Sequence, residues 1–289
     1  MKCIISLVLS GLFFSSSLLA QNFANNGPRI LDQVSVVTST AEDDATRISS
    51  RELYVMENSM NDFSSSIWSR DIYRQISDGV EGNETFFFPE KSTETRVNMF
   101  SLLINLISTN TIKAYSYQDQ PDMSEKNIYP AKEVLSDNLI PFTEKGDGTY
   151  AIKNEDIPSS KILHYLVKEK WYFDIKTFKG DIRVTHICPV IYDKGKHYPL
   201  FWISFDDVSV YMARAVSPVS VANISPVLSN ASMFDVIRNR YYRGCIYQVG
   251  LRQLSYYFPD MKDLIEERKR IENELDYIQA KFYAAERRR

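Results

Sequence analysis

Apolar and polar positions alternate along residues 162–190, and this alternation predicts β-strands. In Ile162–Phe173 the odd-numbered positions are apolar, with Glu169 as the exception. Because successive side chains of a strand point to opposite faces, these positions form one apolar face. In Ile182–Val190 the even-numbered positions, which include His186 and Cys188, form the set that we expect to be buried.

A turn and a third apolar run follow these two segments. Residues Asp193–Lys196 have the composition of a hairpin turn, and Leu200–Phe205 is apolar on both faces of an extended chain. A strand with two apolar faces is typical of the middle of a sheet. We therefore expect three adjacent antiparallel strands.

Two segments before this block have helical spacing. A cap at Asn61 or Asp62 begins an expected helix that runs to about Ser77, and a second helix is expected from Ser92 or Thr93. In both segments apolar residues recur three or four positions apart, which is the period of one helix face. The residues of the first stripe are Trp68, Ile72 and Ile76, and those of the second are Val97, Phe100, Leu103 and Ile107.

The remaining segments of the central region are shorter. Ile112–Tyr115 is expected to be a strand, and residues 116–160, with four prolines, a loop with short elements. A helix is expected over Asp206–Val216. Ser232 and Asp235 have the spacing of a capping box, which predicts a helix from there to about Tyr242.

A heptad pattern begins after Pro259. Leu264, Ile271 and Ile278 lie seven residues apart. Met261, Leu275 and Phe282 occupy the alternate seam, so we expect one long helix. Two interpretations stay open: the helix pairs with another chain, or it folds back onto its own domain.

These patterns together predict an α+β fold. We expect a central antiparallel sheet of short strands flanked by helices, plus a long C-terminal helix. The expected organisation is a signal peptide (1–20), a flexible N-terminal arm (21–50), an α+β domain (51–258) and a charged, heptad-patterned C-terminal helix (259–289).

The N-terminus has the three parts of a secretory signal peptide. Lys2 supplies the positive charge, residues 4–14 the apolar centre, and Leu18-Leu19-Ala20 the small-residue cleavage site before Gln21. No later stretch reaches the roughly 20 apolar residues that span a bilayer. We therefore expect export to the periplasm and no direct membrane span.

Two cysteines, Cys188 and Cys245, remain after removal of the signal peptide. In an oxidising compartment an even pair is compatible with a disulfide. The alternative is a pair of buried free thiols, which suits Cys188 on an apolar strand face.

The sequence lacks the usual catalytic and cofactor motifs. It contains no G-x-S-x-G, H-E-x-x-H or glycine-rich phosphate loop, and we expect no cofactor. His186 and Cys188 share a strand face, but two ligands leave a zinc site incomplete, so we expect no metal. Asp206-Asp207 is better explained as a helix start than as a glycosidase dyad. A formal net charge of −3 argues against a nucleic-acid partner.

Lys168–Asp174 and Arg183–Pro189 are the most informative of several segments that occur in order along residues 51–258. They resemble the K-E-x-W-x-F-D … R-I-x-G-I-x-P pattern of the GldN/PorN family of gliding motility and type IX secretion proteins. His186 stands where a glycine is usual. The other matching segments are Trp68–Ile76, Asn98–Leu103, Ile112–Tyr115, Leu200–Ile203 and Phe234–Tyr242.

This resemblance implies a non-enzymatic periplasmic subunit associated with the outer membrane. The implied partners are an outer-membrane lipoprotein, with which it builds a ring, copies of itself, and the periplasmic part of a shaft protein anchored in the inner membrane. Aromatic and arginine side chains are enriched in such contacts. The residues expected at the interface are Trp68, Arg70, Arg74, Arg240 and Tyr242, with Leu264, Ile271 and Ile278 where the helix pairs.

Two other functions compete with this interpretation. The aromatic residues could form the platform of a periplasmic carbohydrate-binding or surface-attachment module, with Trp171 and Trp202 as the main candidates. A hydrolase of unfamiliar type is the third possibility and needs a pocket that gathers polar groups. Trp68 also has an alternative role as a core residue.

Overall fold

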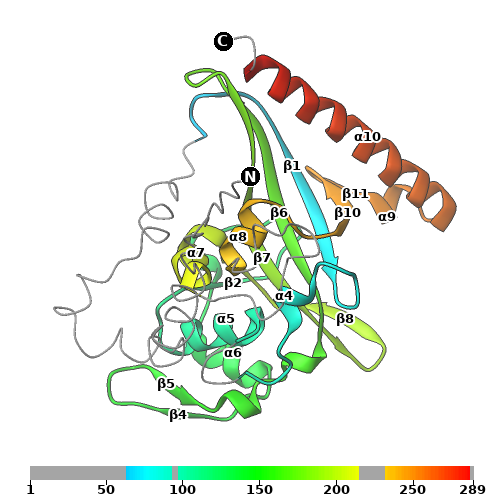
Figure 1. Cartoon of the computed structure of the whole chain (residues 1–289). Coiled ribbons are helices and arrows are strands. Elements are labelled where there is room, and N and C mark those ends of the chain that lie inside the picture. The colour runs from blue at the N-terminus through cyan, green and yellow to red at the C-terminus, as the bar shows by residue number, and fades with distance from the viewer. Residues whose placement is uncertain (1–62, 93–96, 215–231, 287–289) are drawn as a thin grey trace, which may run out of the picture.

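A computed structural model describes residues 63–92, 97–214 and 232–286 of the chain. Its centre is a nine-stranded sheet in which all pairs are antiparallel. The strand order is β11-β10-β1-β6-β7-β9-β2-β3, and β8 pairs with β7 outside this path (Figure 1). The strands are β1 (Ser66–Ser77), β2 (Ala114–Ser116), β3 (Ile128–Tyr129), β6 (Ile162–Asp174), β7 (Lys179–Asp193), β8 (Lys196–Pro199), β9 (Phe201–Ser204), β10 (Gly244–Val249) and β11 (Arg252–Gln253).

Helices cover one face of the sheet and form the main core with it. Short elements fill residues 116–160 as predicted, among them a separate hairpin of β4 (Phe142–Glu144) and β5 (Tyr150–Ile152). The fold class is α+β, as the sequence indicated. The helices are α4 (Glu84–Phe87), α5 (Met99–Ser108), α6 (Ala131–Asp137), α7 (Phe205–Arg214), α8 (Met233–Arg238), α9 (Leu254–Tyr257) and α10 (Met261–Glu286), with 3-10 turns at Glu125–Asn127, Asn154–Asp156 and Ser159–Lys161.

The prediction of a helix up to Ser77 is wrong, because Ser66–Ser77 form strand β1. Trp68, Ile72 and Ile76 are four residues apart, and a spacing of four places residues on one face of a strand as well as of a helix. Arg70 and Arg74 lie on the same face between them and conceal the alternation. The expected caps Asn61 and Asp62 fall outside the described residues.

The three expected strands are confirmed as the adjacent strands β6, β7 and β9. Glu169 shares the apolar face of β6 and is fully buried there. The prediction that Ile182–Val190 buries a single face is wrong. Val184 pairs with Glu169 and His186 pairs with the preceding residue, Lys168, so Thr185 has no paired residue on β6 and forms a bulge. Since one extra residue reverses the alternation, the residues beyond the bulge face the other side of the sheet.

Turns and helix ends follow local chemistry. Asp193 pairs with Lys196 across a turn in which Lys194 and Gly195 have positive φ, as a two-residue hairpin requires. The capping box of Ser232 and Asp235 is present at the start of α8. The helix ends at Arg238 rather than near Tyr242, because Arg240 has a φ of +56° and leaves the helical conformation.

The second helix, α5, begins at Met99 rather than near Ser92. Its cap is Asn98, whose side chain accepts a hydrogen bond from the Ser101 amide. Residues 93–96, which include Thr93, fall outside the described residues. The expected helix over Asp206–Val216 is α7, which the structure describes to Arg214, and the following residues to 231 are likewise outside the description.

The C-terminal helix folds back onto its own sheet. Leu264, Ile271 and Leu275 of α10 are buried against Ile72, Trp171 and Ile182 of the sheet, and Ile278 packs at their margin. The heptad pattern left open whether the helix pairs with another chain or folds back, and in the structure it folds back onto its own domain. In Figure 1, α10 (red) crosses beside the long strands β1 and β6.

Candidate interaction surfaces

A buried carboxylate organises the sheet face between the main core and α10. Glu169 on β6 forms ion pairs with Arg74 of β1 (Nε–Oε1, 3.1 Å) and Arg240 after α8 (Nε–Oε1, 3.3 Å). The Tyr242 hydroxyl donates to the same carboxylate at 2.7 Å and the Trp171 indole at 2.9 Å. Four donors thus surround one buried charge, which is the condition under which such a charge is tolerated.

These partners determine the ionisation of Glu169. Burial by itself raises the pKa of the carboxyl group, but Arg74, Arg240, Trp171 and Tyr242 together hold this pKa below its ordinary value. Arg240 also lies over the Trp171 ring, 4.9 Å from its centre. The network is therefore charged at neutral pH and joins three segments that are distant in the sequence.

The same network extends to α10. Arg74 donates two hydrogen bonds, of 2.5 and 3.0 Å, to the carboxylate of Glu272. Arg70, four residues before Arg74 on the same face of β1, pairs with Glu274 at 2.7 Å. Arg268 of α10 donates to the carbonyl of Ile246 on β10 at 2.8 Å. Polar contacts therefore fix the register in which α10 lies on the sheet.

Apolar contacts complete this docking. Each of the three buried aliphatic side chains of α10 contributes about 2 kcal/mol through burial. At its C-terminal end, Phe282 contacts Trp68 and Phe173 with ring centres 5.9 and 5.8 Å apart. The ring also fills the space above Gly180, where no side chain stands.

The eight residues that the sequence analysis expected at an intermolecular interface make contacts within the chain. Six lie between the sheet and α10, and Arg240 and Tyr242 bind Glu169 beside them. Arg74, Tyr242, Leu264 and Ile271 are buried, so they have no surface to offer a partner. Their residue types were informative, because arginine and aromatic side chains suit any interface, but periodicity alone does not distinguish internal from external contacts. The other four residues, partly exposed at the same place, are Trp68, Arg70, Arg240 and Ile278.

The cysteines are not bonded to each other. Cys188 on β7 is buried and Cys245 on β10 is exposed, and both thiols are free. The register places them in one row across the sheet, but β1 and β6 lie between them. Three strand spacings are about 14 Å, and a disulfide needs Cα atoms within about 7 Å.

The other candidate residues of the sequence analysis have structural roles in the part of the chain that the structure describes. His186 hydrogen-bonds Thr185 at 2.8 Å, and burial lowers its pKa to about 4, so it is neutral at physiological pH. No three metal-ligating side chains gather in residues 63–92, 97–214 and 232–286, and no helix there has the length and apolarity of a membrane span. Trp171 and Trp202 are fully buried, which removes the main candidates for a carbohydrate platform.

An exposed aromatic surface lies at the β11 edge of the sheet, and we call it the edge patch. It comprises Leu251, Gln253, Tyr256 and Tyr257, from the β10–β11 turn, β11 and α9. Leu251 and Tyr256 are 85% and 82% exposed. Sequence reasoning missed these residues, because exposed aromatics cannot be told from buried ones by composition; the Tyr-Tyr pair just before Pro259 is the only signal.

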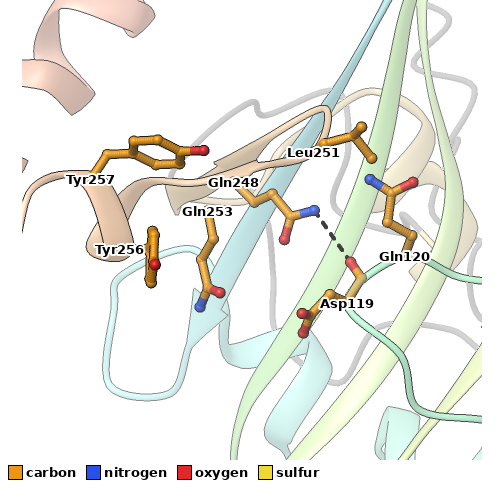
Figure 2. Close-up of a pocket in the computed structure, with 7 residues that line it drawn as sticks. All are labelled: Asp119, Gln120, Gln248, Leu251, Gln253, Tyr256 and Tyr257. Carbon is orange, nitrogen blue, oxygen red and sulfur yellow. Dashed lines mark hydrogen bonds between the residues drawn. The ribbon is translucent and has the colours of Figure 1, made fainter.

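The edge patch borders a hollow of about 310 Å³. Figure 2 shows Tyr256 and Tyr257 on one side of it and Asp119 and Gln120 on the other. The Gln248 amide donates to the Asp119 carbonyl at 3.3 Å and ties the two sides together. The Tyr256 and Tyr257 rings pack edge-on with centres 5.6 Å apart, and Arg252 lies over the Tyr257 ring at 4.8 Å, so the hollow is flanked by aromatic side chains that are held in place and largely exposed.

Comparison with known proteins identifies the family of the chain. No curated protein sequence matches the chain. The family model described as gliding motility associated protein GldN matches residues 62–284, which is most of the chain and includes β1, the Glu169 network and nearly all of α10. The chain therefore belongs to the GldN family, the members of which are components of the gliding motility and type IX secretion machinery.

Proposed function

We propose that the chain is a non-enzymatic periplasmic subunit that works by binding neighbouring proteins. After signal-peptide cleavage near Ala20 it associates with the outer membrane and builds a ring with a lipoprotein partner and further copies of itself. The ring is contacted by the periplasmic part of a shaft protein anchored in the inner membrane. Family membership supports the class of machinery, and the partners are part of the proposal.

The edge patch is the observation that carries this proposal. Exposed aromatic side chains at the margin of a rigid sheet are typical of protein contacts, in which tyrosines are enriched and water is displaced from apolar surface. A ring arises when one surface of a subunit binds a different surface of the next and the rotation closes. Most of the residues that the sequence analysis assigned to these contacts lie between the sheet and α10 and the others bind Glu169, so we assign partner binding to the edge patch.

Co-expression tests the proposal. Residues 21–289 are produced with the lipoprotein, purified through a tag on the lipoprotein and examined by electron microscopy. We expect a megadalton ring with the wild-type chain and loss of co-purification with a Tyr256→Ser/Tyr257→Ser variant. Tyr277→Ser, at a similarly exposed tyrosine on α10, is the matched control and should assemble normally. Normal assembly of the double variant would reject the edge patch, and failure of the wild type to bind any outer-membrane component would reject the proposal.

A glycan-binding function is the alternative, and one observation favours it. Tyr256 and Tyr257 stand beside Gln253 at an open hollow, an arrangement of rings and amides that suits sugars. Affinity gels containing purified envelope glycans separate the two functions. Retardation that is lost in Tyr256→Ser/Tyr257→Ser would favour the alternative, and unchanged mobility would favour the structural subunit.

A further inference from the structure

The hairpin between β6 and β7 reaches one end of the described structure, together with the start of β1 and the C-terminal end of α10. In Figure 1 these strands (green) rise together to a loop at the top, far from α5 and α6 and near the C-terminal end of α10. The loop is Ile175–Phe178, between Asp174 at the end of β6 and Lys179 at the start of β7. The loop is therefore at one extremity of the described structure.

The loop carries two exposed apolar side chains where loops are ordinarily polar. Ile175 and Phe178 are 46% and 51% exposed, and Ile67 on the adjoining end of β1 is 65% exposed. Turn positions favour Gly, Asn, Asp and Ser, which satisfy the backbone and suit water. We call Ile67, Ile175, Lys176, Phe178 and Lys179 the hairpin tip.

The loop has a defined conformation, in which the Phe178 ring packs edge-on against Phe173 with ring centres 6.5 Å apart and remains about half exposed. The Asp174 carboxylate accepts hydrogen bonds from the amides of Lys176 (2.7 Å) and Thr177 (3.3 Å), and the Ile175 amide donates to the Ser65 carbonyl at 3.1 Å. Phe178 has a φ of +53°, a region that glycine and asparagine adopt far more readily than a bulky residue. Phe178 therefore holds an unfavourable backbone conformation while about half of its side chain stays exposed.

The charges beside these apolar groups are positive on balance. Lys176 and Lys179 are exposed on either side of Phe178. The adjoining Asp174 carboxylate stays negative, because amides of the turn donate to it and its pKa is lowered, so two positive charges stand against one negative charge. Apolar side chains flanked by lysines suit the boundary of a bilayer, where the apolar groups enter the acyl region and the amines contact anionic headgroups. A protein partner ordinarily needs a broad surface of about 800 Å², which a convex hairpin tip does not offer.

We infer that the hairpin tip is a peripheral contact with a lipid surface that contains anionic headgroups. Phe178 and Ile175 insert between the headgroups, and Lys176 and Lys179 bind their negative groups. The inference goes beyond the proposed ring and does not depend on it, because a monomer in solution contains the complete tip.

Vesicle flotation with purified residues 21–289 tests the inference. We expect binding to phosphatidylethanolamine vesicles with about 30% phosphatidylglycerol and much weaker binding to phosphatidylcholine alone. Ile175→Ser/Phe178→Ser should weaken binding about tenfold or more, and Lys176→Glu/Lys179→Glu should abolish the preference for anionic vesicles. Leu139→Ser is the matched control, because Leu139 is also an exposed apolar residue at positive φ, and it should bind as the wild type does.

Three outcomes would overturn the inference. They are absence of wild-type binding to anionic vesicles, equal binding to neutral ones, and wild-type affinity in the Ile175→Ser/Phe178→Ser variant. Concentration-dependent self-association in size-exclusion chromatography that this variant loses, without any effect of lipid, would assign the tip to a contact between copies. Both tip variants should still co-purify with the lipoprotein in detergent, which separates a failure of this inference from a failure of the proposed function.

Discussion

The ring of Phe282 in α10 lies directly against Gly180 in β7. A β-carbon built on this glycine would come within 2.0 Å of the Phe282 Cγ, far closer than atoms in contact can approach. Glycine is thus required here for close packing between the helix and the sheet. The C-terminal end of α10 depends on the absence of one side chain.

Gly180→Ala should therefore displace the end of α10. We expect a loss of about 1–3 kcal/mol in the free energy of unfolding, measured in urea, because overpacking forces the ring or the strand to move. Hydrogen exchange should increase in the last turns of α10. Gly146→Ala is the matched control, since nothing lies within 4 Å of its β-carbon position, and it should stay within about 0.5 kcal/mol of the wild type.

Glu169→Gln should be strongly destabilising. The substitution removes the charge that offsets Arg74 and Arg240, of which Arg74 is buried. Breaking a buried pair in this way costs about 3–5 kcal/mol, because an uncompensated charge remains. Urea unfolding measures the loss, and Glu266→Gln on the exposed side of α10 is the control. A loss below about 1 kcal/mol would mean that water or Glu272 compensates the arginines.

Acid should remove this contribution of Glu169. The folded-state pKa of Glu169 lies below its ordinary value of 4.5, so its stabilising effect is complete above that value and is lost as the pH falls through the folded pKa. The difference in unfolding free energy between wild type and Glu169→Gln should shrink between pH 7 and about pH 3. Other carboxylates are common to both proteins and cancel. A constant difference over this range would contradict the assignment.

Thiol labelling should distinguish the two cysteines. Burial raises the pKa of Cys188 and shields it, whereas Cys245 is exposed. In the native mature chain we expect rapid modification of Cys245 only, and of both after unfolding in urea without reductant. Cys245→Ser should abolish the rapid reaction. If neither thiol of the wild type reacts until a reductant is added, the cysteines are bonded and their strands differ from this arrangement.

The sequence determined those elements in which local pattern and packing agree. Strand β6 was predictable because its apolar face repeats at period two, and α8 because Ser232 and Asp235 complete a cap using nearby backbone only. The Asp193–Lys196 turn likewise needs only its own residues. The family pattern around Trp171 was also readable in the chain itself.

Only the tertiary structure decided what depends on distant partners. Arg70 and Arg74 occupy the apolar face of β1 because Glu274, Glu272 and Glu169 neutralise them there, and no local pattern could reveal those carboxylates. The bulge at Thr185 likewise arises from pairing with β6. Heptads are compatible with a partner helix or with the chain's own sheet. In α10, Leu264, Ile271 and Leu275 are buried against the sheet, and only the tertiary structure shows this.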